Sequence, residues 1–194
     1  MVVDGCSIKP SLSVKLLGVT LDHHLSFSDH INNVTKKCHG IIGVLARASH
    51  SLPRELLRLA YIALVRSHLE YSSAICSTAS KSQLKKLDII QKISARVICL
   101  APRDAHAAPL LQSLKLDSLE SRRNFHIISI VRSILSGNCH PSLRHMFSIA
   151  PNGLVTNNEI SIKRMGQRRF RNSAREIFNA ALQFPSVSSA APLV

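Results

Sequence analysis

Apolar positions recur at helical spacing through most of this chain, and the pattern predicts a mainly α-helical fold. The clearest stripe begins after Ser28 or Asp29, both good N-cap residues, and ends near Ala48. Its apolar members fall within about 100° of a helical wheel: Ile31, Val34, Cys38, Ile41, Ile42 and Leu45. Gly40 and Gly43 each lower the intrinsic helicity by roughly 1 kcal/mol, which suits a close approach of two backbones.

The next predicted helix runs from Arg54 to about Tyr71, because Ser51-Leu52-Pro53 breaks the chain and Pro53 suits a first helical turn. Its apolar residues are spread nearly all round the wheel: Leu56, Leu57, Leu59, Ile62, Leu64, Val65 and Leu69. A helix that is apolar on every side is usually buried. We therefore expect it to be the central and most buried helix of the fold.

A helix with a cationic edge follows. Ser80 and Gln83 form a capping-box pattern at its start, and Ala101-Pro102 ends it after Leu100. At a helical step of about 100° per residue, four cations share an arc of roughly 60°: Lys81, Lys85, Lys92 and Arg96. The opposite, broadly apolar side should be wedged between other helices, so only the basic edge should face solvent. Asp88 interrupts this edge, and an ordinary solvated surface is the alternative to a binding role.

A fourth long helix is predicted from Leu119 to about Ser136, between the N-cap Ser118 and the stop signal Gly137. The inward positions of this helix are expected at Phe125, Ile128, Val131 and Leu135. Residues 105–109 before it are predicted as a loop, and Leu110 to Leu114 as a short helix.

Two arginines occupy the first turn of this fourth helix. Arg122 and Arg123 lie where the helix dipole disfavours cations unless an anion or an acidic side chain compensates. Glu120 is the local candidate for that role.

The two ends of the chain carry weaker patterns. Val2-Val3 and Cys6 to Lys9 flank an Asp-Gly turn, and Ser13 to Leu21 reads as a third strand. Towards the C-terminus the patterns predict a short helical segment from Pro141 to Phe147, a turn-rich linker over 150–158, a strand from Glu159 to Arg164 and a helix from Asn172 to Phe184. We divide the chain into a small sheet (1–27), a helical domain (28–149) and a basic extension (150–194).

Charge narrows the choice of partners. Lys and Arg outnumber Asp and Glu by 25 to 11, which gives a net charge of +14 and points to an anionic partner. Nucleic acid and an anionic membrane surface are the candidates, and no polybasic block beside a long apolar run favours the membrane. No apolar run approaches the roughly 18 residues of a membrane span, and no secretory signal opens the chain, so we expect an intracellular protein, nuclear or cytoplasmic.

Five cysteines without a CxxC pair indicate reduced thiols. Cys38-His39 and Cys139-His140 lack the ligand spacing of a zinc site, so neither a metal nor another cofactor is expected. The densest basic cluster lies near the C-terminus: Lys163, Arg164, Arg168, Arg169, Arg171 and Arg175.

Several segments resemble the reverse transcriptases of non-LTR (LINE-type) retrotransposons. Val14 to Asp22, followed by Leu25-Ser26-Phe27 and His30-Ile31, is similar to that family's "K-Y-L-G-V-x-L-D … L-S-W … H-I" segment, which closes the palm. Leu64-Val65 with Leu69-Glu70-Tyr71 resembles its "L-V-x-P-x-L-E-Y" helix.

Further motifs follow in the family's order. Gln91 with Ala95-Arg96 is similar to "Q-x-x-A-x-R", and Leu116, Leu119 and Arg122-Arg123 are similar to "L-x-x-L-x-x-R-R". Ser173-Ala174 with Asn179 to Pro185 resembles a weakened "W-N-x-L-P" ending. The resemblance implies the last palm strands, a helical thumb-like bundle and the region after it, with Leu17, Gly18 and Val19 at the place of the primer grip.

The resemblance also implies what is missing. Polymerisation requires acidic residues that hold two divalent metals, and in this family an upstream palm motif with two adjacent aspartates supplies them. This chain has no Asp-Asp pair, so we expect a non-catalytic C-terminal part whose upstream palm and fingers are its natural partners.

Our main hypothesis is that this part binds RNA or DNA without sequence preference, through phosphates. The expected contacts are Lys36, Lys81, Lys85, Lys92, Arg96, Lys163, Arg164, Arg168, Arg169 and Arg171. The alternatives are an inactive retrotransposon remnant and a helical protein-interaction module, and exposed Val14, Leu16 and Leu17 would favour these. A hydrolase is not indicated, because no Ser or Cys lies in a recognisable sequence motif of a catalytic nucleophile.

Overall fold

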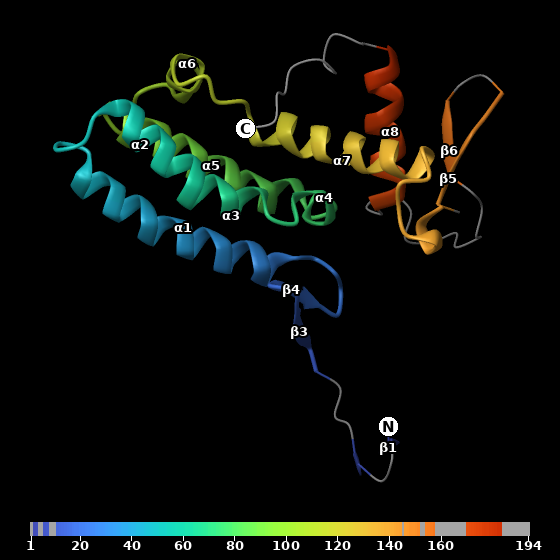
Figure 1. The fold of residues 1–194 in the computed structure, drawn as a ribbon. Helices are drawn as coiled ribbons and strands as arrows, with labels where there is room; N and C mark the ends of the chain where they lie inside the picture. The colour runs from blue at the N-terminus through green and yellow to red at the C-terminus, as the bar shows by residue number, and fades with distance from the viewer. Residues whose placement is uncertain are drawn as a thin grey trace.

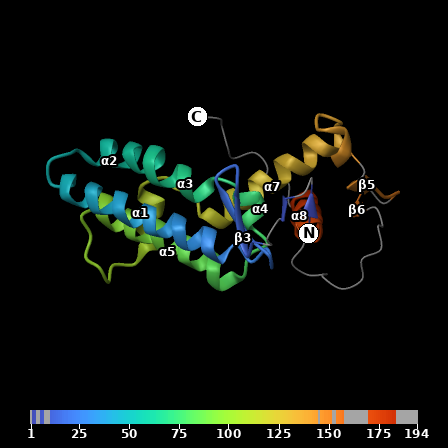
Figure 2. The same ribbon diagram turned by 90° about the horizontal axis from the view of Figure 1, so that it is seen from below.

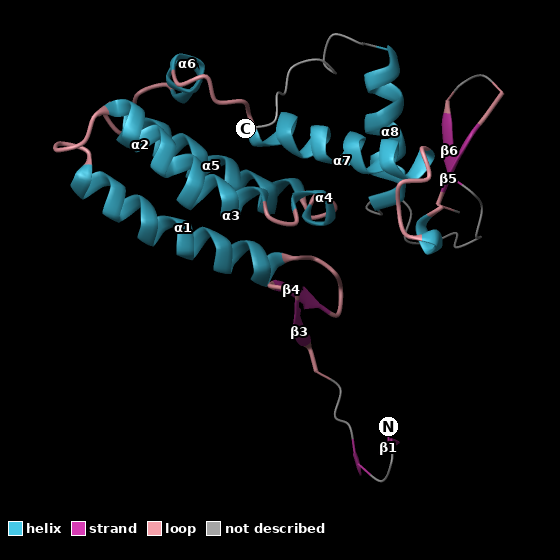
Figure 3. Ribbon diagram, viewed as in Figure 1, coloured by secondary structure: helices cyan, strands magenta, loops and turns pink. Residues whose placement is uncertain are grey.

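The computed structural model describes residues 2–3, 6–7, 11–144, 146–151, 154–157 and 170–183. These residues form a mainly helical fold with small antiparallel β hairpins, as the sequence predicts (Figures 1 and 3). The helices are α1 (Ser28–Ala48), α2 (Arg54–Ala60), the π-helix η1 (Tyr61–Arg66), α3 (Ser67–Glu70), α4 (Ser73–Cys76), α5 (Lys81–Ile98), α6 (Ala107–Ser113), α7 (Leu119–Leu135), the 3-10 helix η2 (Pro141–Leu143) and α8 (Phe170–Gln183). The strands are β1 (Val2–Val3), β2 (Cys6–Ser7), β3 (Ser13–Leu16), β4 (Val19–Asp22), β5 (Phe147–Ile149) and β6 (Val155–Asn157).

The N-terminal strands form two separate hairpins. β1 pairs with β2 as predicted, but the single strand predicted from Ser13 to Leu21 is wrong. That segment folds back on itself, because Leu17 and Gly18 both have positive φ angles, 46° and 82°, and form a tight turn between β3 and β4. β4 packs against α1, and all four residues of β3 are exposed.

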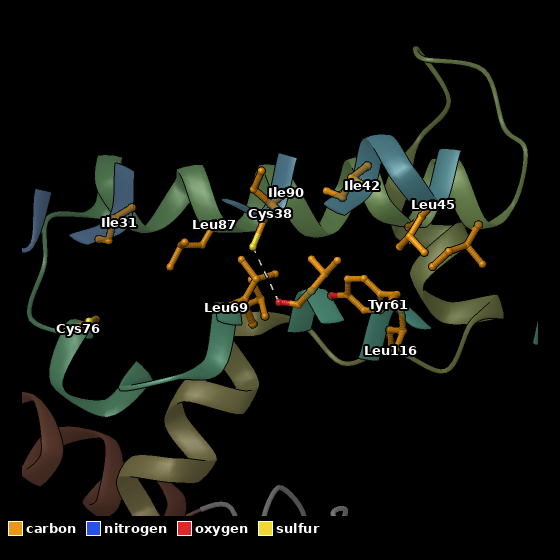
Figure 4. Packing of buried hydrophobic residues seen from close by; sticks show 14 of the residues in the cluster. Ile31, Cys38, Ile42, Leu45, Tyr61, Leu69, Cys76, Leu87, Ile90 and Leu116 are labelled. Carbon is orange, nitrogen blue, oxygen red and sulfur yellow. Dashed lines mark hydrogen bonds between the residues drawn. The ribbon is translucent and has the colours of Figure 1, made fainter. Parts of the chain in front are cut away.

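Helices α1 and α5 lie side by side and run in the same direction (Figures 1 and 2). Helix α1 has the predicted length, and its stripe enters the core through Ile31, Cys38, Ile42 and Leu45 (Figure 4). Its N-cap is Phe27, in a left-handed conformation with φ 58°, whereas Ser28 is already helical. The predicted close approach at Gly40 and Gly43 is wrong, since a Cβ at Gly40 would meet nothing within 4 Å.

The chain from Arg54 to Glu70 is not buried all round, and our prediction of a most buried central helix is wrong. Its buried residues follow one another at intervals of four: Leu57, Tyr61, Val65 and Leu69. An α-helix has about 3.6 residues per turn, so a four-residue repeat drifts around it in one sense, and the wider turns of a π-helix shift the repeat in the opposite sense and offset that drift. η1 supplies those turns and leaves the other leucines of this segment on the surface.

The segment between α5 and α7 differs from the prediction at one end. Helix α6 begins at Ala107 and contains Pro109, so the loop predicted over 105–109 is shorter. Helix α7 begins at the predicted N-cap, where Ser118 Oγ accepts a hydrogen bond from the Ser121 amide at 3.1 Å. Phe125 is 38% exposed and Ile127 is fully buried, so Phe125 is not among the inward residues of α7.

A second, smaller core joins α7, α8 and the β5–β6 hairpin. Its centre is formed by Ile127, Val131, Phe147, Val155 and Phe178. The predicted helical segment from Pro141 to Phe147 is wrong beyond Leu143, and the predicted linker over 150–158 contains strand β6. The strand predicted from Glu159 to Arg164 lies outside the described residues, and the last predicted helix is α8.

Candidate nucleic-acid interface

The predicted cationic edge of α5 faces outward. Lys81, Lys85 and Lys92 are exposed, while Leu87 and Ile90 on the other side of the helix are buried. The helix begins at the predicted N-cap, because the Gln83 amide donates to Ser80 Oγ at 3.4 Å. The cap and the buried back of α5 therefore fix the direction in which the lysines point.

Arg96 and Asp88 belong to this edge by sequence, but both have partners in the fold. Arg96 Nε donates to Ala105 O at 2.9 Å and so ties down the loop that follows α5. Asp88 Oδ1 lies 3.5 Å from Arg123 Nη1 of α7. The carboxylate that interrupts the lysine edge is thus partly neutralised by an arginine.

Helix α1 extends the cationic surface beyond α5. Gln83 Nε2 donates to Ser28 Oγ at 3.1 Å, and Lys86 Nζ donates to Asn32 Oδ1 at 2.7 Å, so the two helices are aligned from their first turns. Lys36 is exposed and follows Asn32 by one helical turn on the same edge of α1. We call the surface formed by the exposed Lys36, Lys81, Lys85 and Lys92 and the half-buried Lys86 the lysine face.

The C-terminal cations are not part of this face. Lys163, Arg164, Arg168 and Arg169 lie outside the described residues. Arg171 lies in the first turn of α8, which packs on α7 and stands apart from α5 in Figures 1 and 2.

A tyrosine of the helical body contacts the turn between β3 and β4, the turn that the family resemblance predicts as the primer grip. Tyr71 Oη donates to Leu17 O at 2.5 Å, and a Cβ at Gly18 would lie 3.4 Å from the Tyr71 ring. Val19 is buried, whereas Leu17 is 84% exposed. Leu17 therefore lies exposed at the tip of the turn, and the turn is held by its contacts with Tyr71 and by the buried Val19.

A buried histidine also ties this hairpin to α1. The Thr20 amide donates to His30 Nδ1 at 3.4 Å, and His30 is 6% exposed. Burial lowers the pKa of His30 from its ordinary value of 6.5, and only an unprotonated Nδ1 can accept this hydrogen bond.

Glu70 joins helices α3 and α7 through two arginines. Its carboxylate accepts hydrogen bonds from Nε and Nη2 of Arg122, and the bond from Nη2 measures 2.9 Å. The same carboxylate forms an ion pair with Arg66, whose Nε lies 3.4 Å away. The hydrogen bonds with Glu70 raise the pKa of Arg122. The prediction that Glu120 compensates Arg122 and Arg123 is wrong, because Glu70 and Asp88 reach them from other helices.

Sequence reasoning missed that several motif residues have structural roles. Glu70, Tyr71 and Arg122 all belong to segments quoted for the family resemblance, and here they connect the hairpin, α3 and α7. Gln91 is buried and its Nε2 donates to Asp117 O at 2.8 Å, which fixes the loop before α7. Their place in the family motifs was the one sequence signal that marked these residues. It could not indicate their partners, which are 26 to 54 residues away in the chain.

The described part of the chain gives little support for a metal site, a functional acidic residue or a membrane-spanning helix. There, no group of three or more His, Cys, Asp or Glu side chains could hold a metal ion. Asp22 accepts hydrogen bonds from the Ser26 hydroxyl and amide, and these lower its pKa, so its role is to fix the bend before α1. None of the described helices is long and apolar enough to cross a membrane.

Comparison with known proteins identifies relatives of one kind. No family model and no solved structure matches the chain. The chain is 31% identical over 123 residues to the RNA-directed DNA polymerase from mobile element jockey of Drosophila melanogaster, across 60% of this chain and 13% of that protein. It is 25% identical over 128 residues to the probable RNA-directed DNA polymerase from transposon BS of the same species, across 64% of this chain and 14% of that protein.

The chain thus spans only about one seventh of the length of these curated relatives. Both are polymerases of non-LTR mobile elements, the family that the sequence motifs indicate. The chain is therefore similar to one region of a LINE-type reverse transcriptase.

Proposed function

We propose that this chain is a non-catalytic, thumb-like part of a LINE-type RNA-directed DNA polymerase that binds template-primer nucleic acid through its phosphates. The observation that carries the proposal is the lysine face. Lys81, Lys85 and Lys92 are all exposed on α5, and Lys36 adds to them from the neighbouring helix. Ammonium groups in a row along a rigid helix suit a chain of phosphates, which also repeats at intervals of a few ångströms.

The binding mode follows from what surrounds the lysines. Among the described residues, the exposed large aromatic side chains are Tyr71 and Phe125, and neither belongs to α1 or α5. Base stacking needs aromatic rings beside the backbone-binding groove. We therefore propose contacts to phosphates that read no sequence.

The proposal assigns catalysis to other parts of such a polymerase. The aspartates of this chain are scattered and include no adjacent pair, whereas two-metal catalysis needs carboxylates close together. The purified chain, given template-primer, Mg²⁺ and nucleotides, should extend no primer. Primer extension would contradict this part of the proposal.

The β3–β4 hairpin supports a second part of the proposal, a contact with the upstream palm. Val14 pairs with Leu21 and Leu16 with Val19, so these four side chains share one face of the hairpin. The β4 half of that face packs on the helical core, while Val14 and Leu16 remain 58% and 57% exposed. The same exposure also favours the alternative function, a helical protein-interaction module or an inactive remnant. We propose that the palm of the same polymerase covers the β3 half.

This contact can be tested by mixing the chain with a separately expressed palm of the jockey polymerase. Replacing Val14 and Leu16 by Thr should abolish association and change the stability of the chain by less than about 1 kcal/mol, because both side chains are exposed. Association that is unaffected by the double change would count against the proposed palm contact.

The nucleic-acid proposal is tested by binding measurements against salt. Each phosphate-binding lysine that is removed should lower the slope of log K against log salt by about one, equally for RNA and DNA of any sequence. The test variant carries Lys85→Gln and Lys92→Gln. The control carries Lys37→Gln and Lys115→Gln, which remove the same charge from exposed positions outside the lysine face.

The wild type and the control should show the same slope of log K against log salt, and the magnitude of this slope should be smaller by about two in the test variant. Equal loss in both variants would mean that only the net charge matters. Affinity that does not change with salt would remove phosphate binding altogether.

A further inference from the structure

The two outer edges of the β5–β6 hairpin differ in their partners (Figures 1 and 3). On the β6 edge, the side-chain amide of Asn179 from α8 binds the backbone of Val155. Val155 N donates to Asn179 Oδ1 at 2.9 Å, and Asn179 Nδ2 donates to Val155 O at 3.0 Å. This amide makes the two hydrogen bonds that a neighbouring strand would make, so β6 is closed to a further strand at Val155.

The register of the hairpin determines where the backbone groups of β5 point. Ile149 pairs with Val155, whose N–H and C=O point away from β5 towards Asn179. In an antiparallel pair, two residues opposite each other either exchange both backbone hydrogen bonds or direct these groups outward. Ile149 therefore directs its own N–H and C=O away from β6. The next pair faces inward, as this alternation requires, because Ala150 N donates to Leu154 O at 2.8 Å.

The outward backbone groups of Ile149 have no partner among the described residues. Ile149 is 62% exposed, so its N–H and C=O are accessible from outside. A donor and an acceptor side by side on an exposed strand edge can pair with another extended chain. The β5 edge thus lacks the amide group that the β6 edge receives from Asn179.

A groove opens beside β5. It has a volume of about 570 Å³ and lies between β5 and the C-terminal end of α7, within the range of sites that hold a ligand. Its floor is apolar, because Ile134 and Phe147 line it and are 5% and 4% exposed. An extended peptide that pairs with Ile149 would therefore place apolar side chains in this groove.

Arg144 gives the groove its charge. It is exposed and lines the groove, and its Nη2 donates to Gly137 O at 3.2 Å, which holds the guanidinium group at the end of α7. This bond uses one of the five N–H donors of the guanidinium. No acidic residue lines the groove. Charge therefore favours an acidic partner over a second copy of this chain, which would bring the same arginine and another charge of +14.

We propose that β5 binds an extended, acidic peptide segment of a partner protein by strand addition. One residue of the segment exchanges two backbone hydrogen bonds with Ile149, as Asn179 does with Val155 on the other edge. Alternate side chains of the segment point to the same side, so one set packs into the apolar groove and a carboxylate reaches Arg144. The three residues of β5 extend about 10 Å, which corresponds to a segment of about three or four residues.

The test follows the Ile149 amide by NMR in the isotope-labelled full chain. The first peptide alternates valine with threonine and carries glutamates at both ends. The second has the same side chains with methylated amide nitrogens in its centre, and the third has lysines in place of the glutamates. The first peptide should shift the Ile149 amide signal and slow its hydrogen exchange at least about tenfold, because the amide becomes hydrogen-bonded.

The other two peptides separate the backbone bonds from the charge. Methylation removes the backbone donors, so the second peptide should bind at least about tenfold more weakly. The third should bind about threefold more weakly or less tightly still, because Arg144 is an exposed charge. Arg144→Gln should weaken binding of the first peptide by a similar factor.

Variants at Ile149 then locate the site. Ile149→Pro removes the outward N–H, which the β5–β6 pairing does not use, and proline is tolerated at such edge positions. It should weaken binding of the first peptide at least about tenfold, while the Val155 and Asn179 signals remain in place and show that the hairpin persists. The matched control, Ile149→Thr, changes the same side chain but keeps the N–H and should retain binding within about threefold.

A last variant excludes general attraction between opposite charges. Lys85→Gln with Lys92→Gln should leave binding of the first peptide unchanged. The proposal is overturned if this lysine variant weakens binding as much as Ile149→Pro does, if the methylated peptide binds as tightly as the first, or if no peptide changes the Ile149 amide. Self-association that Ile149→Pro abolishes, without peptide binding, would assign the β5 edge to a second copy and also overturn it.

Discussion

At the scale of residues, a few polar side chains of the described structure each contact a segment that is distant in the sequence. Glu70 connects α3 to α7 through Arg122, and Tyr71 connects the end of α3 to the Leu17 carbonyl. His30 connects α1 to β4. None of these links could be read from the sequence, because the local candidate, Glu120, was as plausible a partner for Arg122 as Glu70 was.

The ion pairs of Glu70 should contribute to stability. Its side chain is 16% exposed and its two arginine partners are 16% and 22% exposed, so removing its charge leaves arginines poorly solvated. Glu70→Gln should lower the free energy of unfolding by about 2 kcal/mol, measured by urea denaturation. Glu55→Gln, at an exposed position on the preceding helix, serves as the control and should change it by less than about 0.5 kcal/mol.

Protonation of His30 should loosen the hairpin. The pKa of His30 is lower in the folded protein than its ordinary value of 6.5, so the unfolded chain binds more protons below that pH. The contribution of the neutral imidazole to stability is therefore complete above pH 6.5 and is lost as pH falls towards the lower, folded-state pKa. The cause of the lowered pKa is the burial of His30, which disfavours the charged imidazolium.

The measurement compares stability against pH in three proteins. His30→Gln keeps an acceptor for the Thr20 amide and should flatten the fall in stability below pH 6.5. His39→Gln, on the exposed side of the same helix, should keep the wild-type slope. Identical slopes in all three proteins would show that His30 is not the group responsible.

At the scale of elements, the sequence predicts long, singly striped helices well and fails where the backbone leaves regular geometry. The predicted α1 matches the observed Ser28–Ala48 because its apolar residues follow an α-helical repeat. The segment from Arg54 to Glu70 does not, because its apolar residues are spread nearly all round an α-helical wheel, whereas the buried ones are Leu57, Tyr61, Val65 and Leu69. The prediction of a single strand from Ser13 to Leu21 also fails at irregular backbone geometry. Leu17 adopts a positive φ, which non-glycine residues seldom have, and the chain turns there.

The candidate site shows the same division. The lysine edge of α5 could be predicted because it depends on one helix alone, and all three lysines are exposed where the wheel places them. The contribution of α1 to the lysine face depends on how two helices align, which Lys86 and Asn32 show in the structure. The exposure of Leu64 depends on the π-helix, so the sequence alone misassigned this residue to the core.

The π-helical register makes a clear prediction about two neighbours. Val65 is fully buried and Leu64 is 50% exposed, whereas an α-helical wheel gives Leu64 a buried position. Val65→Ala should lower the free energy of unfolding by about 2 kcal/mol, and Leu64→Ala by less than about 1 kcal/mol. The reverse order, with the leucine change costing more, would show that the segment is α-helical in solution.

The glycines of α1 are expected to be dispensable. A Cβ at Gly40 would meet nothing within 4 Å, so Gly40→Ala should raise the free energy of unfolding by up to about 1 kcal/mol through helix propensity alone. Gly137 differs, because its φ of 77° is unfavourable for alanine, and Gly137→Ala should destabilise the protein. A lower stability of Gly40→Ala would instead support the close backbone approach that the sequence suggested.

At the scale of the whole molecule, the structure places different chemistry on different faces. The lysine face of α1 and α5 is cationic, α2 and η1 present exposed Leu56, Leu59 and Leu64, and the β3–β4 hairpin presents exposed Val14 and Leu16. Two of the partners that we propose, nucleic acid and the palm of the polymerase, would then bind at different surfaces. Such a division suits a part of a larger polymerase, and the curated relatives are about seven times longer than the matched region.

The central claim, that the lysine face holds nucleic acid, is tested most directly by lysine footprinting. The chain is acetylated with and without an RNA–DNA duplex at low salt, and the rate at each lysine is read by mass spectrometry. Lys36, Lys81, Lys85 and Lys92 should react more slowly in the complex, while Lys37 and Lys115, equally exposed elsewhere, should react at the same rate. Equal slowing at all six lysines, or slowing at Lys37 and Lys115 alone, would contradict the account.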